Sequence, residues 1–157
     1  MKRNRKIAYL GLGIALYVVL SAFVIIPIIN RIKLDLGYIV FGLYLERFGI
    51  SAAIVGVAGC IIANLLKGGS LPIAWAIGQL FIGLTLGYLL PRTKKMAYKA
   101  IWCILMCFIG IALIKTILEI WMFHYPLIAK FSSNAVAFLA DAIPLLIGVM
   151  LKKKIRF

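Results

Sequence analysis

Six runs of apolar residues alternate with short polar or basic segments along this chain. A helix needs about 20 residues to cross the hydrocarbon of a bilayer, and about 17 is the practical minimum. Most of the runs meet this length, and nothing between them is long enough to form a soluble domain. The pattern predicts an all-α integral membrane protein, a six-helix bundle in which residues 1–157 form a single transmembrane domain. The predicted helices cover residues 7–29, 34–46, 50–66, 71–90, 100–123 and 134–151.

Basic residues gather at every second connection between these runs. Six crossings place thirteen of the 18 Lys and Arg residues on one side and four on the other, with Lys115 inside a helix. Short cytoplasmic loops accumulate Lys and Arg, so both termini are expected in the cytoplasm and the chain in the cell membrane. The basic clusters are Lys2/Arg3/Arg5/Lys6, Arg47, Arg92/Lys94/Lys95/Lys99 and Lys152/Lys153/Lys154/Arg156.

The second run is the shortest, and at 1.5 Å per residue it covers roughly 20 Å. A re-entrant segment there would move every later connection to the opposite side, and the basic residues would then be concentrated outside. The charge pattern rejects that topology and favours a short second helix. The first run, from Ile7 to about Ile29, is longer than the apolar part of a signal peptide. It is followed by no small-residue cleavage site, and it predicts a transmembrane helix.

Composition agrees with a membrane protein and excludes several classes of site. The chain is 65% hydrophobic and 14% charged, with a mean hydropathy of +1.11. The net charge of +14 comes from residues that flank apolar runs, which indicates lipid headgroups rather than nucleic acid as the partner. Cys60, Cys103 and Cys107 lie within apolar runs. Cys103 and Cys107 are four residues apart, but two thiols supply only half of the ligands of a metal site. We therefore expect no metal and no cofactor.

With this orientation, nearly every strongly polar side chain inside an apolar run falls in the outer half of the membrane. Buried charge in a membrane is costly, and such residues are candidates for a functional site. Asp141 has no basic residue on its own helix, which favours a cavity-lining role. The candidate substrate-binding residues are Asp141, Asn134, Trp75, Gln79, Glu119, Lys115, Asn64 and Lys67.

Two of these candidates, Glu119 and Trp75, and the nearby acid Asp35 have alternative roles that remain open. Glu119 can form an ion pair with Lys115 at i, i+4 on the same helix. Asp35 can cap the second helix, and Trp75 can belong to an aromatic belt at the membrane interface.

Small residues gather in the cytoplasmic half, where they allow helices to approach closely. The pair Gly83-x-x-x-Gly87 predicts packing inside the bundle. The pair Gly11-x-x-x-Ala15, at the start of the first helix, predicts an exposed face that receives another protein.

The whole pattern resembles the substrate-binding S-components of energy-coupling factor (ECF) transporters. The resemblance rests on GLGIALYVVLSAFVIIP in the first helix, on the Gly-rich run from GYIVFGLYLERFG to IGLTLGYLLP, and on the ending NAVAFLADAIPLLIGVMLKKK. It covers nearly the whole chain, with Gly11-x-x-x-Ala15 in place of the family's Ala-x-x-x-Ala. It implies a subunit that captures a vitamin or similar micronutrient from outside, associates with a transmembrane coupling protein driven by two ATPases, and topples in the membrane to release its cargo. The chain has no phosphate-binding Gly-x-x-x-x-Gly-Lys-[Ser/Thr] motif, so ATP hydrolysis is expected in the partners.

The sequence also bears on two further classes of function, an intramembrane enzyme and a self-sufficient channel or carrier. An intramembrane enzyme lacks support, because the single His lies at a helix end and no nucleophile accompanies the acids. A self-sufficient channel or carrier remains an alternative, although the internal repeats common in such proteins are not visible. For the ligand, Trp75, Tyr38 and Phe131 could stack on a planar ring, and a zwitterionic or partly cationic aromatic compound is expected.

Overall fold

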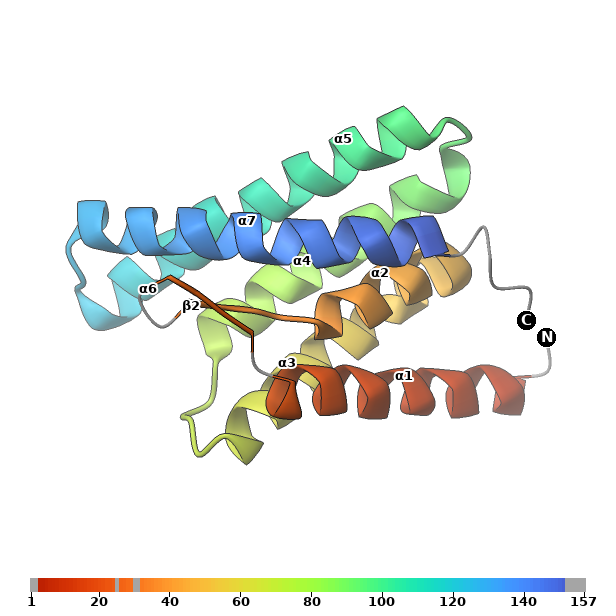
Figure 1. The fold of residues 1–157 in the computed structure, drawn as a ribbon, viewed down its shortest axis with the longest axis horizontal. Coiled ribbons are helices and arrows are strands. Elements are labelled where there is room, and N and C mark those ends of the chain that lie inside the picture. The colour runs from red at the N-terminus through yellow and green to blue at the C-terminus, as the bar shows by residue number, and fades with distance from the viewer. Residues whose placement is uncertain (1–2, 25, 30–31, 152–157) are drawn as a thin grey trace.

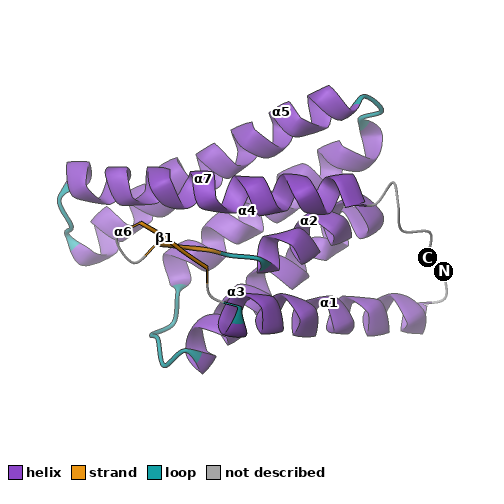
Figure 2. Ribbon diagram, viewed as in Figure 1, coloured by secondary structure: helices purple, strands orange, loops and turns teal. Residues whose placement is uncertain are grey.

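The structure is a computed structural model that describes residues 3–24, 26–29 and 32–151. Helices account for most of it, with a two-stranded hairpin near one end (Figure 2). The helices are α1 (Arg3–Phe23), α2 (Gly37–Phe48), α3 (Ala53–Leu66), α4 (Ile73–Leu89), α5 (Met96–Cys107), α6 (Thr116–Phe123) and α7 (Leu127–Leu151). Between them lie the 3-10 turns η1 (Gly49–Ala52) and η2 (Leu90–Arg92), the π-helical segment η3 (Phe108–Lys115), and the strands β1 (Ile26–Ile29) and β2 (Ile32–Leu34).

Successive helical stretches of the chain run in opposite directions, with α5, η3 and α6 forming one continuous stretch, and the chain reverses at η1 between α2 and α3 (Figure 1). Gly49 ends α2 with φ at 62°, a conformation that glycine adopts without steric cost. The ring of Tyr17 lies against both Gly37 at the start of α2 and Gly59 in α3. At the other end, Lys6 donates a hydrogen bond to Ser51 at 2.6 Å. The start of α2 therefore lies at the C-terminal end of α1, and the reversal between α2 and α3 lies at the N-terminal end of α1.

Five helical stretches in the described part of the chain are long and apolar enough to cross a membrane. One of them, 37–66, contains the reversal at η1, so length alone does not give the number of crossings, and six remains a prediction. Many large apolar side chains face outward, among them Leu84, Trp121 and Ile128. Such a surface requires a hydrocarbon environment, and the prediction of an all-α membrane protein is confirmed.

The first predicted helix is too long at its C-terminal end. α1 ends at Phe23, and residues 26–29 form β1, which pairs antiparallel with β2. Pro27 has no backbone N–H to donate within a helix, and it is flanked by β-branched residues that suit a strand. Hydropathy is the same for either structure, so it could not separate the helix from the hairpin.

The last two predicted helices also differ from the observed ones. α7 begins at Leu127, before the predicted start at residue 134. The residues between Pro126 and Asn134 are already helical, although several of them have polar side chains. The predicted helix over 100–123 begins at Met96 and contains η3, for which the sequence offered no indication. The π segment brings Gly110 against Gly78 of α4.

The closest helix contact joins α2 and α7, which also pack together most extensively. A Cβ added at Gly148 would lie 2.0 Å from the carbonyl oxygen of Ile39, and one added at Gly42 would lie 2.3 Å from that of Leu145. Gly83 and Gly87 pack against Ala53 and η1, which confirms their predicted role inside the bundle. The sequence gives no indication of the contacts of Gly42 with Leu145 and of Gly148 with Ile39, since these residues are distant in the chain.

Described basic residues gather at the end of the bundle opposite the hairpin, where α1 begins and α7 ends (Figure 1). There Lys99 pairs with the buried carboxylate of Glu46 at 2.5 Å, joining the start of α5 to the end of α2. Lys2, Arg31 and the cluster from Lys152 to Arg156 lie outside the described residues.

Candidate binding cavity

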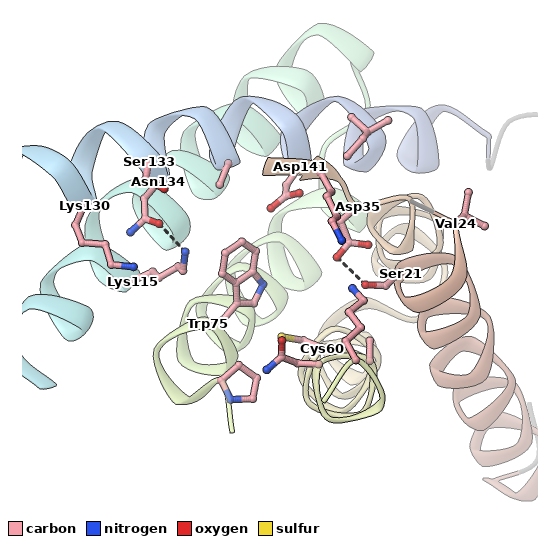
Figure 3. A pocket seen from close by; sticks show the side chains of 17 residues that line it. Ser21, Val24, Asp35, Cys60, Trp75, Lys115, Lys130, Ser133, Asn134 and Asp141 are labelled. Carbon is pink, nitrogen blue, oxygen red and sulfur yellow. Dashed lines mark hydrogen bonds between the residues drawn. The ribbon is translucent and has the colours of Figure 1, made fainter. Parts of the chain in front are cut away.

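A polar cavity of about 370 Å³ lies at the hairpin end of the bundle. Its wall is built from the C-terminal ends of α1 and α3, from β2, from the start of α4, from the end of η3, and from α7 (Figure 3). This volume is in the range that holds a small molecule.

Most of the predicted site residues meet on this wall. Asp141, Asn134, Lys115, Trp75, Asn64 and Lys67 all line the cavity, although they come from α7, η3, α4 and the end of α3. Two predicted residues lie behind it. Gln79 is buried and donates a hydrogen bond to the hydroxyl of Tyr38, and Glu119 contacts the cavity residues from outside the lining.

Asn134 and Lys115 stand at the centre of a hydrogen-bonded cluster on one side of the cavity. The ammonium of Lys115 donates to Oδ1 of Asn134 at 2.6 Å. The amide of Asn134 donates to Thr116 and to Glu119, both at 2.9 Å. The expected pairing of Lys115 with Glu119 is present at 3.7 Å, and Lys130 adds a second ion pair with Glu119 at 3.3 Å.

Trp75 lies beside this cluster, with the ammonium of Lys115 3.8 Å from the centroid of its ring. A cation over an aromatic face is attracted by the electron density of the ring, more strongly where water is excluded. The contact holds the indole in place at the cavity wall. Trp75 therefore both lines the cavity and packs against Lys115.

Asp141 lies on another part of the wall and is 2% exposed. Its Oδ2 atom is buried without a hydrogen-bond partner. A buried polar atom that lacks a partner costs free energy, about 1–3 kcal/mol and more when charged. A hydrogen-bond donor placed in the cavity could remove that cost.

Asp35 lies near Asp141 on the same side of the cavity (Figure 3). Its carboxylate accepts hydrogen bonds from the hydroxyl of Ser21 and from the backbone N–H of Gly37, both at 2.9 Å. Burial raises the pKa of the Asp35 carboxyl above its ordinary value, while these hydrogen bonds act in the opposite direction. The expected backbone-capping contact at the start of α2 is therefore present, and the same residue also lines the cavity.

Several wall residues were not among the predicted site residues, including Ser21, Lys33, Cys60, Lys130 and Ser133. The sequence predicts a loop at Lys130 and Ser133, although the spacing of Lys130 from Asn134 and Asp141 is that of one helix face. Two predicted aromatic contacts lie elsewhere. Tyr38 is buried among Tyr17 and Phe41, and Phe131 is exposed outside the cavity lining.

The fold and the cavity together define a class: a helical membrane protein that presents a polar, small-molecule-sized cavity at one end of its bundle. Comparison with known proteins makes this specific. A family model described as the ECF-type riboflavin transporter S component matches residues 2–156. The chain belongs to this family of transporter S-components, as the resemblance implied.

Solved structures of S-components share the fold. FolT bound with folic acid superimposes with a TM-score of 0.75 and 20% identity, covering 97% of this chain and 95% of FolT. The S-component for biotin from an ECF-type ABC transporter gives a TM-score of 0.73 and 19% identity, over 98% and 93% of the two chains. At this identity the likeness establishes the fold alone.

Curated relatives match over a shorter stretch. Two UPF0397 proteins from strains of Streptococcus thermophilus are 31% identical over 90 residues, which is 55% of this chain and 50% of each relative. The chain thus spans about half the length of the curated relatives it matches.

Proposed function

We propose that this chain is the substrate-binding subunit of an ECF-type importer, which captures a small water-soluble vitamin or related micronutrient in the cavity at the hairpin end. The observation that carries the proposal is the unpartnered, buried Oδ2 of Asp141 on a polar wall of this size. Asn134, Lys115, Trp75, Asn64 and Lys67 contribute the surrounding contacts. Gln79 and Glu119 act indirectly. Gln79 donates a hydrogen bond to Tyr38, and Glu119 accepts one from Asn134.

Delivery in this proposal requires a transmembrane coupling protein and two ATPase subunits. Gly11 and Ala15 lie exposed on α1, and a Cβ added at Gly11 would meet no atom within 4 Å. A flat, small-residue surface of this kind allows a second helix to approach closely. We assign the contact with the coupling protein to this face.

The orientation follows from charge. With six crossings and both termini in the cytoplasm, the end of the bundle that carries Lys6, Arg92 and Lys99 faces inward. The hairpin end and its cavity then face the outside of the cell membrane, where the nutrient is encountered.

The first experiment asks whether the purified full-length chain holds a small molecule in this cavity. Native mass spectrometry of the gently purified protein should show a co-purified compound, and thermal-shift titrations with riboflavin, folic acid and biotin provide defined probes. Ala137→Trp places a large side chain in the cavity wall and should abolish binding. Leu84→Trp, on the exposed face of α4, is the matched control and should leave it unchanged.

The alternative function, a self-sufficient carrier or channel, is separated by transport. Proteoliposomes that hold the chain alone should show no uptake of the bound compound, and uptake should appear when the coupling protein and ATPases are added with ATP. Uptake by the chain alone, or equal binding by the two Trp variants, would contradict the proposal.

A further inference from the structure

The cavity wall contributed by α7 has a basic outer end and an acidic inner end. Lys130, Asn134, Ala137 and Asp141 all line the cavity, at spacings of three or four residues that place them on one helix face. Lys130 and Asp141 are eleven residues apart, which corresponds to roughly 16 Å along the helix axis. The wall is therefore long compared with a single ring.

Positive charge is in excess at the outer end of this wall. Lys115 and Lys130 share one carboxylate, that of Glu119, at 3.7 Å and 3.3 Å. The side chain of Lys130 remains 26% exposed, so an anion in the cavity can reach its ammonium. A carboxylate or phosphate placed here would complete the charge balance of the cluster.

The acids at the inner end share the cavity with Lys33 and Lys67, so the two ends differ in how their charges are paired rather than in the absence of cations. Asp141 forms no ion pair in the part of the chain that the structure describes, and its Oδ2 has no hydrogen-bond donor. Asp35 lies beside it, already bonded to Ser21 and to Gly37. Figure 3 shows Trp75 between the two ends, with Lys115 and Lys130 on one side and both acids on the other.

We infer that the cavity selects an elongated amphoteric compound, with a ring that bears N–H or O–H donors at one end and a carboxylate or phosphate at the other. The donor end lies inward against Asp141, and the anionic end lies outward against Lys130. This inference rests on the proposed function, and it specifies the chemistry and the direction of the ligand in the same cavity.

Matched pairs of probes isolate the anionic group. Flavin mononucleotide and riboflavin share one ring system and differ in a phosphate, and folic acid and its dimethyl ester differ in two carboxylates. Affinities of the full-length protein for all four are measured by titration in detergent. In the pair whose ring is accepted, the anionic member should bind up to about fivefold more tightly, which is the upper end of the range for one partly exposed ion pair.

Two variants test the direction of binding. Lys130→Gln should remove the preference for the anionic member and leave its uncharged partner unaffected. Asp141→Asn should weaken both members of the pair by about tenfold or more, because the donor end is common to them. Lys94→Gln, at the opposite end of the bundle, and Ser132→Ala, whose hydroxyl bonds only within its own helix turn, are the controls.

The outcomes are distinguishable from failure of the proposed function. If a probe binds with no preference for the anionic member, or if Lys130→Gln weakens both members equally, the inference is overturned and the binding function stands. If none of the probes binds but a compound co-purifies, an acidic group and ring donors in that compound support the inference, and their absence overturns it. If nothing binds and nothing co-purifies, both proposals are wrong.

Discussion

The contact of α2 with α7 leads to a prediction whose size can be worked out from the structure. In Gly148→Ala, the new Cβ would lie 2.0 Å from the carbonyl oxygen of Ile39, whereas real Cβ atoms essentially never approach a neighbour within 3.0 Å. The two helices must therefore separate by about 1 Å, because a backbone carbonyl cannot rotate away as a side chain would. Overpacking of this kind costs about 1–3 kcal/mol, and the backbone clash favours the upper part of that range.

A smaller effect opposes this cost. Alanine is more favourable than glycine inside a helix by roughly 1 kcal/mol, so the net loss of stability in Gly148→Ala is about 2 kcal/mol. For a chain of this length, 1 kcal/mol corresponds to roughly 2–4 °C in the melting temperature, which predicts a decrease of about 4–8 °C. The measurement is thermal unfolding in detergent, followed by circular dichroism or by a thiol-reactive dye that reports on the buried cysteines.

Gly11→Ala is the matched control, since it makes the same chemical change in a helix where the added Cβ meets nothing. Its melting temperature should be equal to that of the wild type or slightly higher. Ligand affinity should also decrease in Gly148→Ala and not in Gly11→Ala, because α7 carries Asn134 and Asp141. If Gly148→Ala melts at or above the wild-type temperature, the close contact does not exist in the protein.

Three further predictions concern the core, the partner surface and the orientation. Tyr38→Phe removes the hydrogen-bond acceptor of the buried Gln79 amide and should destabilise the protein by about 1–3 kcal/mol in chemical or thermal unfolding, whereas an unchanged midpoint would show that the amide has another partner. Gly11→Phe should greatly reduce co-purification of the coupling protein while ligand binding stays normal, and undiminished co-purification would move the interface away from α1. In intact cells, a membrane-impermeant maleimide should label Ser70→Cys and not Lys94→Cys; the reverse pattern would refute the proposed orientation.

Hydropathy and charge were sufficient to predict the membrane class, the approximate positions of the helices and six of the seventeen residues that line the cavity. They succeeded because burying polar side chains in a membrane is costly, so residues such as Asp141 and Lys115 are rare and indicate where a polar cavity must lie. The orientation of the chain across the membrane is part of the same argument, and it remains a prediction from the charge pattern.

The features that the sequence did not reveal depend on three-dimensional neighbours. The apolar character of residues 24–34 is compatible with a helix or with a hairpin. Pro27 is likewise consistent with the end of a helix or with part of a strand. The contacts of Gly42 with Leu145 and of Gly148 with Ile39 join residues more than a hundred positions apart in the chain, where no local spacing rule applies. Lys130 was assigned to a loop because Pro126 precedes it, although proline is well tolerated at the first turn of a helix.

The π-helical segment η3 determines which way the polar residues after it point. A π-helical turn holds more residues than a regular α-helical turn, so the eight residues of η3 advance less far around the helix axis than eight α-helical residues would. If the same residues formed regular α-helix, Lys115 and Glu119 would be rotated around the axis toward a different neighbour. A substitution that favours regular helix within 108–115, with the chain length unchanged, would therefore turn these two charges away from the cavity wall.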